Sequence, residues 1–294
     1  MFDLITVVFE PELPLLEIQA RSIDQNFEPE QISTIFVVVN DKDSVVTLVN
    51  KTWYGKFQDK VVVYPYSMFG YVNKVGGWDN QQLCKILAAS RSISIWSIVL
   101  DAKTFFVKKC KNELLFDQNN KACTNLLKPV PVFQSAKEYV EKLYDIQLLD
   151  IIGPGGVPFF FHNETVRSMI EDTQKITGQL FIDFFQNNVC YPNLITEFYL
   201  YSAYVKYKYG KYDDLYSPKQ RWTCVNIADW EVDNFTELFN NMQKFLTLTV
   251  SIASKSWAIL PHEQQQQYLE FLHTKNLIQD TQITQNKLNT VINQ

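Results

Sequence analysis

The stretch that decides the fold reads IWSIVLDAK and runs from Ile95 to Lys103. An apolar run ends in the carboxylate of Asp101, and a lysine follows two residues later. Short runs rich in Ile, Val and Leu are typical of buried central strands, and ligands of α/β sheets bind beyond the carboxyl ends of such strands. We therefore predict a central strand over residues 95–100, with Asp101 and Lys103 facing a ligand. The alternative is an ordinary turn after a strand, where aspartate is common.

The composition is that of an acidic, aromatic-rich globular chain. Its 294 residues predict one large domain, or one domain with a subdomain, and 46% hydrophobic residues suffice for a sizeable core. The net charge of −5 disfavours nucleic acid as a partner, because bulk binding requires a basic face. Five scattered cysteines predict reduced thiols. We see no signal peptide and no transmembrane segment, and therefore expect a cytoplasmic protein.

The N-terminal third alternates between strands and helices. We predict strands over residues 4–9, 32–40 and 60–64, and helices over residues 15–26 and 78–91. Residues 44–57 read best as a helix, with a strand as the competing interpretation because of the valines between 45 and 49. This β-α-β-α-β order indicates a mostly parallel sheet flanked by helices.

The remainder mixes helices and strands. We predict helices over residues 136–149, 164–175, 179–188, 196–209, 234–245 and 263–273, and strands over 104–107, 158–161, 222–227 and 246–252. Residues 112–131 are polar and irregular, which favours a mobile loop or an edge hairpin, and residues 153–156 form a sharp loop. The polar residues 274–294 predict a loosely held or helical tail.

Polar side chains follow the predicted parallel strands where these strands end. They are Glu10, then Asn40 and Asp41, then Tyr64 and Tyr66, and finally Asp101 and Lys103. Because the carboxyl ends of parallel strands meet at one edge of a sheet, they predict a nucleotide-sized site there. The Asp41 carboxylate would accept hydrogen bonds from a ribose or a base. The alternative for Asp41 is a capped turn before the next helix.

Further candidates lie on predicted helices. Gln81 and Lys85 share one helix face next to Gln82, and a lysine there could hold a phosphate; the alternative is a solvated face. Glu197 begins a tyrosine-rich helix and, if buried near the cleft, would act as a general base. The alternative is a first-turn acid favoured by the helix dipole. The three histidines form neither a metal spacing nor a triad with a serine.

Several motifs carry a resemblance to a known family. They span nearly the whole chain, and their order is more informative than any single one: ARSI at 20–23, QQLCK at 81–85, IVLDAK at 98–103, TEFYLY at 196–201 and SWAIL at 256–260. With them the sequence resembles the GT-A-type nucleotide-diphospho-sugar transferases, and more closely a poorly characterised microbial and viral branch of unknown function.

The resemblance implies an α/β GT-A fold with a Rossmann-like half, residues 1–110, that binds a nucleotide sugar. Residues 111–273 would form the acceptor-side half of the same domain, with a helical C-terminal part, and residues 274–294 a polar tail. The implied nucleotide- or substrate-binding residues are Phe9, Asn40, Asp41, Trp78, Gln81, Gln82 and Lys85.

The sequence departs from the family at its metal motif. GT-A enzymes usually carry an Asp-x-Asp motif that holds Mg²⁺ or Mn²⁺ against the diphosphate, whereas Lys103 stands at the second aspartate position here. Either Asp101 binds a metal with partners from elsewhere, or Lys103 itself neutralises the departing diphosphate. Ala253 stands where related enzymes often place a further histidine ligand, and His262 lies too far along to replace it. Mg²⁺ or Mn²⁺ thus stays an open question, and no other cofactor is expected.

The leading hypothesis is a glycosyltransferase that moves a sugar from a nucleoside-diphosphate sugar to a glycan or another hydroxyl acceptor. Asp101, Lys103 and Glu197 would be its catalytic residues. The alternative is a non-catalytic binding or structural protein that retains the GT-A fold. A nucleotidyltransferase is the third and weakest option, because Glu10 and Glu12 make the first loop acidic where that class needs a basic, glycine-rich one.

Overall fold

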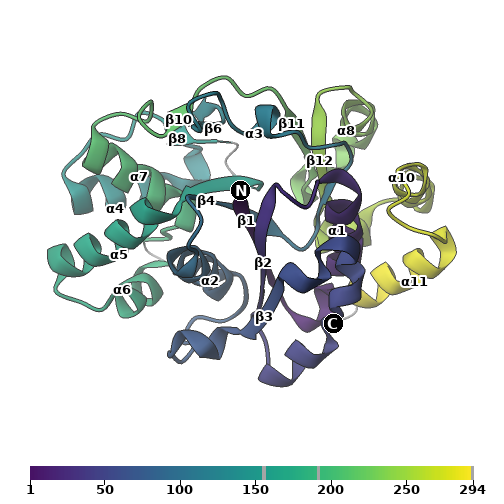
Figure 1. Ribbon diagram of the computed structural model, residues 1–294, viewed down its shortest axis with the longest axis horizontal. Helices are drawn as coiled ribbons and strands as arrows, with labels where there is room; N and C mark the ends of the chain where they lie inside the picture. Colours follow the sequence, from purple (N-terminus) through teal and green to yellow (C-terminus); the bar gives the residue numbers. More distant parts are fainter. Residues whose placement is uncertain (154–156, 191–192, 293–294) are drawn as a thin grey trace.

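A computed structural model describes residues 1–153, 157–190 and 193–292. Its centre is a five-stranded sheet in which four strands are parallel and the last is antiparallel to its neighbour (Figure 1). The order across the sheet is β3 (Val61–Pro65), β2 (Ile32–Val39), β1 (Phe2–Val8), β4 (Trp96–Asp101) and β9 (Phe159–His162). The predicted mostly parallel sheet is thereby confirmed.

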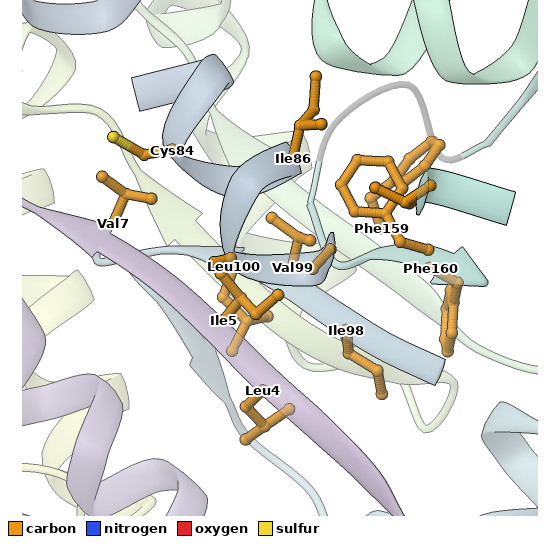
Figure 2. Packing of buried hydrophobic residues seen from close by; sticks show 14 of the residues in the cluster. Leu4, Ile5, Val7, Cys84, Ile86, Ile98, Val99, Leu100, Phe159 and Phe160 are labelled. Carbon is orange, nitrogen blue, oxygen red and sulfur yellow. The ribbon is translucent and has the colours of Figure 1, made fainter. Parts of the chain in front are cut away.

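Helices cover both faces of this sheet. On one face α1 (Leu13–Asn26) packs with the 3₁₀ segment η3 (Lys51–Lys60), and on the other lies α2 (Gly77–Arg91) (Figure 1). Behind α2 lie α5 (Asn163–Thr177), α6 (Phe181–Asn188) and α7 (Glu197–Tyr209), and α4 (Gln134–Tyr144) packs on α7. Residues of β1, β4 and α2 share one apolar core (Figure 2).

A second, smaller sheet and core lie on the far side of α1. The sheet consists of β11 (Thr223–Ile227), β12 (Thr247–Ile252) and β5 (Thr104–Phe106). Its core also receives Leu15 and Ile18 of α1. The C-terminal elements around it are α8 (Phe235–Met242), α9 (Ser254–Ile259), α10 (His262–Thr274) and α11 (Thr281–Ile292). α11 packs on α1, so the helical form of the expected tail is observed.

Short elements complete the chain. Two-stranded pairs join β6 (Ala122–Cys123) to β10 (Tyr216–Ser217), and β7 (Leu126–Leu127) to β8 (Ile151–Ile152). The helical pieces are α3 (Asn112–Leu115), η1 (Glu10–Glu12), η2 (Asp43–Leu48), η4 (Tyr66–Phe69), η5 (Pro131–Phe133) and η6 (Asp229–Asn234). Within the described ranges, no helix is both long and apolar enough to cross a bilayer.

Four sequence-based expectations need correction or restriction. The central strand begins at Trp96, one residue late, because Ile95 is exposed. The expected helix over 44–57 is two 3₁₀ segments, since Val49 and Asn50 are extended between them, and Gly55 with φ 49° kinks the second segment. Residues 112–131 are neither a plain loop nor one hairpin, because β6 and β7 pair with distant strands. Of the expected loop over 153–156, residues 154–156 lie outside the described ranges.

Candidate functional site

The ends of the parallel strands meet at one edge of the sheet. Val8 of β1 lies beside Val39 of β2, and Val7 lies beside Asp101 of β4. The chain leaves β1 toward one face through α1 and enters β4 from the other face through α2. The C-terminal ends of β1 and β4 therefore flank the point where the sheet order reverses, which is where open α/β sheets bind ligands.

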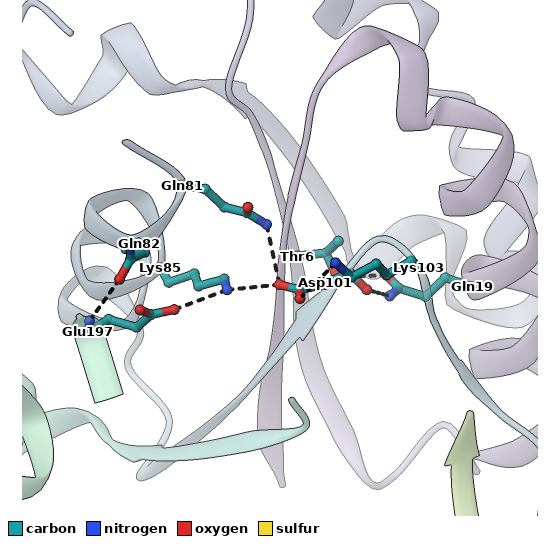
Figure 3. Close-up of polar contacts among 8 residues, drawn as sticks. All are labelled: Thr6, Gln19, Gln81, Gln82, Lys85, Asp101, Lys103 and Glu197. Carbon is teal, nitrogen blue, oxygen red and sulfur yellow. Dashed lines mark hydrogen bonds and ion pairs between the residues drawn. The ribbon is translucent and has the colours of Figure 1, made fainter. Parts of the chain in front are cut away.

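Asp101 is the last residue of β4 and the centre of a polar network at this edge (Figure 3). Its Oδ1 accepts hydrogen bonds from Lys85 Nζ at 2.8 Å and from Gln81 Nε2 at 3.3 Å. Lys103 Nζ lies 3.9 Å from its Oδ2. The Asp101 side chain is 22% exposed and that of Lys103 29%, so both reach the surface. The structure thus brings together the strand-end pair and the helical candidates.

Lys85 and Glu197 form the buried end of the network. Lys85 Nζ lies 3.1 Å from Glu197 Oε1, and each of these two side chains is only 4% exposed. The same nitrogen lies 5.5 Å from the centroid of the Phe198 ring. Thr196 caps α7 through its hydroxyl and so fixes Glu197 in the first turn, where the Gln82 side chain accepts a hydrogen bond from its backbone N–H.

The charges of the network are set by burial and by each other. Burial acts to raise the pKa of Asp101, but the positive charges of Lys85 and Lys103 outweigh it and hold that pKa below its usual value. Burial acts to lower the pKa of Lys85, but Asp101 and Glu197 raise it above its usual value. Burial raises the pKa of Glu197 despite the neighbouring Lys85. Asp101 and Lys85 are therefore charged at neutral pH.

Two roles proposed from the sequence fit this geometry poorly. Glu197 was expected to act as a base toward an acceptor, and Lys85 to hold a phosphate. Both side chains are buried, and the Lys85 ammonium is bound on two sides by carboxylates. The arrangement favours a positioning role for both residues and leaves Lys103 as the exposed cation of the network.

Gln19 is a site residue that the sequence did not reveal. It is fully buried on α1, where its Nε2 donates to the main-chain oxygens of Asp101 at 2.6 Å and Thr104 at 3.0 Å. Its Oε1 accepts from the Thr6 hydroxyl of β1 at 2.7 Å. Gln19 thereby ties the turn after β4 to β1. No helical pattern marked this glutamine, because Ser22 and Asn26, three and seven residues on, are polar residues on the same buried face of the helix.

Glu12 was also missed. It ends η1 directly after β1 and is half-buried, and no hydrogen bond or ion pair of its carboxylate occurs among the described residues. Burial raises the pKa of Glu12 to about 7; Asp101 adds to the rise, while Lys103 and Lys85 oppose it. Glu12 is therefore the carboxylate of this edge that titrates near neutrality.

Replacing Glu12 by glutamine tests this environment without any ligand. Because the folded-state pKa of about 7 lies above the ordinary 4.5, ionisation of Glu12 in this window destabilises the fold. The variant should be more stable than the wild type at pH 8, and this advantage should vanish as the pH falls toward 4.5. Urea unfolding across this range measures it, and a difference that is constant with pH would contradict the assignment.

The nucleoside-side candidates gather beside the network. The Asn40 side chain donates to the Gly77 carbonyl at 2.8 Å and accepts from Asn80 at 2.6 Å, which joins the end of β2 to the start of α2. Asp41 Oδ2 accepts from the Glu10 backbone N–H at 3.1 Å. Phe9 and Trp78 are exposed, at 39% and 58%, along the same edge.

The residues of this edge do not fit a divalent metal. Within the described ranges, no three His, Cys, Asp or Glu side chains lie close enough together to hold a metal ion. Lys85 and Lys103 approach both oxygens of Asp101 instead. His262 faces away, with its Nδ1 3.1 Å from Gln285 Nε2 on α11.

A surface hollow of about 560 Å³, lined by Phe2, Trp96 and Phe116, lies at the opposite edge of the sheet.

Comparisons with known proteins agree with this architecture. The model of a family of unknown function, DUF6492, matches residues 8–245, which is most of the chain. No curated protein matches the sequence. Among solved structures, the apo form of the glycosyltransferase GlyE from Streptococcus pneumoniae TIGR4 matches with a TM-score of 0.50 and 12% identity, over 97% of this chain and 62% of that one. This chain thus spans less than two thirds of GlyE.

Other solved glycosyltransferases match less well. The galactosyltransferase LgtC, in complex with donor and acceptor sugar analogues, gives a TM-score of 0.46 at 9% identity, over 93% of this chain and 96% of that one. The apo structure of the bifunctional glycosyltransferase WbbM gives a TM-score of 0.47 at 12% identity, over 92% of this chain and 49% of that one. At such identities the likeness concerns the fold alone, and that fold is the α/β GT-A fold expected from the sequence.

Proposed function

Because this chain belongs to DUF6492, a family of unknown function, and has the GT-A fold, we propose that it is a glycosyltransferase. Its donor would be a nucleoside-diphosphate sugar and its acceptor the hydroxyl of a glycan or another molecule. The observation that carries the proposal is the Lys85–Asp101–Lys103 network at the C-terminal edge of β4. This edge combines a charged carboxylate for sugar hydroxyls with an exposed ammonium for phosphate.

In this proposal Lys103 binds the diphosphate. Its contact with Asp101 is the loosest of the network, at 3.9 Å, so the ammonium can turn toward a ligand without breaking a short hydrogen bond. Lys85 stays in place because both of its carboxylate contacts are short and buried. The base would stack on Phe9 or Trp78, which are the exposed aromatic side chains beside Asn40 and Asp41.

The transfer step then uses the carboxylates of the edge. The acceptor oxygen forms a bond to the anomeric carbon, and the bond from that carbon to the diphosphate oxygen breaks, with its electron pair leaving on the diphosphate. Lys103 offsets the negative charge that develops there. The acceptor proton passes to Glu12, which has no ion-pair partner among the described residues and whose pKa of about 7 suits a base at neutral pH.

A panel of UDP-, GDP- and CMP-sugars tests the proposal. Calorimetry should detect binding of at least one UDP- or GDP-sugar, which carry the diphosphate that CMP-sugars lack, and slow hydrolysis of that donor should accompany it, with and without Mn²⁺. The alternative function, a non-catalytic protein that retains the fold, is favoured by the short contacts that bind Asp101 and Glu197 to Lys85. Binding without any turnover would support that alternative, and a protein that binds no sugar nucleotide would contradict the transferase.

Replacing Lys103 by alanine should weaken binding of the donor about 10- to 100-fold, because a hydrogen bond to a charged group contributes about 1.5–3 kcal/mol. The stability of the fold should hardly change, since Lys103 is partly exposed. Lys109→Ala is the matched control, because Lys109 is an exposed lysine paired with Glu28. Equal donor affinities in the two variants would refute the phosphate role of Lys103.

A further inference from the structure

A single ammonium group lies between a partly exposed and a buried carboxylate in this protein. Lys85 Nζ of α2 lies 2.8 Å from Asp101 Oδ1 of β4 and 3.1 Å from Glu197 Oε1 of α7 (Figure 3). The two acids are 96 residues apart in the chain, and their oxygens face each other only because the ammonium lies between them. The Phe198 ring lies beside the same nitrogen, at 5.5 Å.

The position of this ammonium is one that a small cation could fill. Two carboxylate oxygens from rigid elements are ligands that hard divalent cations prefer, at about 2.0–2.6 Å. The oxygens around Lys85 Nζ lie farther away, at 2.8 and 3.1 Å, so they would have to close in by up to about 1 Å to bind such a cation. Removing the ammonium would leave two like charges facing each other in a buried space, which is strongly unfavourable. Two ionised carboxylates there therefore favour a cation between them, and the chain supplies its own.

We infer that the Lys85 ammonium occupies the cation position of this site, so that the protein works without a divalent metal. It follows that removal of the ammonium converts Asp101 and Glu197 into a divalent-metal site. The inference rests on the proposed function and deepens it: with Lys85 balancing the two carboxylates, Lys103 is left as the positive charge that faces the diphosphate. Its test measures metal binding and not sugar transfer, so the two can fail separately.

The test is a titration of Lys85→Ala with Mn²⁺, in which the electron paramagnetic resonance signal of the free ion measures how much Mn²⁺ is bound. The truncated side chain leaves room for Mn²⁺ and water between the carboxylates. We expect one Mn²⁺ site with an affinity at least about tenfold above the wild type, because metal affinity follows the number of charged ligands. The same titration of Lys85→Ala/Asp101→Asn should lose this gain. Lys128→Ala, at a surface ion pair, should behave as the wild type.

Two further results decide the inference. Lys103→Asp creates an Asp-x-Asp sequence but keeps Lys85 in place, so it should bind Mn²⁺ no better than the wild type. If it binds Mn²⁺ tightly, or if folded Lys85→Ala binds none, the inference is wrong. Where Lys85→Ala unfolds without metal, Mn²⁺ should raise its refolding yield and melting temperature, and the Asp101→Asn double variant should gain nothing. The absence of such rescue would equally overturn it.

Discussion

Replacing Lys85 by methionine is expected to lower the free energy of unfolding by about 3–5 kcal/mol, because the change leaves buried charges without their partner. Methionine keeps most of the volume of lysine, so the loss reports charge and not a cavity. Both carboxylates are affected at once, since the Asp101 and Glu197 oxygens share the one ammonium. Urea unfolding of the variant and the wild type at neutral pH measures the difference.

Lys128→Met is the matched control for this experiment. Lys128 Nζ lies 2.8 Å from Asp150 Oδ1, the same separation as in the Lys85–Asp101 pair, but its side chain is 80% exposed. Exposed ion pairs contribute about 0–1 kcal/mol, so this variant should retain almost all of its stability. Similar losses in the two variants would show that burial does not govern the Lys85 network.

The pH dependence of the free energy of unfolding is a second measure of the effect of Lys85. In the wild type the pKa of Asp101 is lowered, so the ionised Asp101 carboxylate stabilises the fold at pH values above the ordinary pKa of an aspartate. This stabilisation is lost as the pH falls. In Lys85→Met burial and mutual repulsion raise both carboxyl pKa values, so that ionisation destabilises the fold and protonation relieves it. The stability gap between the two proteins should therefore narrow as the pH is lowered.

The sequence predicted the sheet because its strands are buried on both faces. Every residue of β1 is buried, and an apolar run of this kind has few interpretations other than a central parallel strand. The positions of Asp101, Asn40 and Asp41 followed from the same argument, since strand ends in a parallel sheet converge whatever the helices do. That part of the site depends on topology alone.

The contacts that give the site its charge could not be predicted in this way. The pairing of Lys85 with Glu197 depends on how α7 packs on α2, and no local pattern encodes the packing of two helices so far apart in the chain. The burial of every residue of α7 from 199 to 205 similarly hid its inward face, because buried residues do not mark one side of this helix. The sequence showed Glu12 only as part of an acidic loop, since its environment arises from burial in the folded chain and from Lys103 and Asp101 across the sheet edge.

Asp101→Asn is expected to lower sugar transfer about 100-fold or more, because a displacement of reacting groups by about 1 Å can cost that much. Asparagine retains the shape of the side chain and an oxygen for Lys85, but it removes the charge that orients the sugar and holds Lys103. The fold should persist, since Gln19 binds the main-chain oxygen of residue 101 and Lys85 keeps Glu197. Initial rates with the donor identified in the panel, together with urea unfolding, measure both effects.

Glu197→Gln separates the chemistry of Asp101 from the mere loss of a partner for Lys85. Each substitution removes one of the two negative charges beside the same ammonium, but the folded-state pKa is lowered for Asp101 and raised for Glu197, so Asp101→Asn should lose more stability than Glu197→Gln. Only Asp101 reaches the cleft, at 22% exposure against 4% for Glu197, so the loss of transfer should be much larger for Asp101→Asn. If both variants lose activity equally, Asp101 acts only through Lys85. If Asp101→Asn transfers sugar at the wild-type rate, the edge of β4 is not the active site.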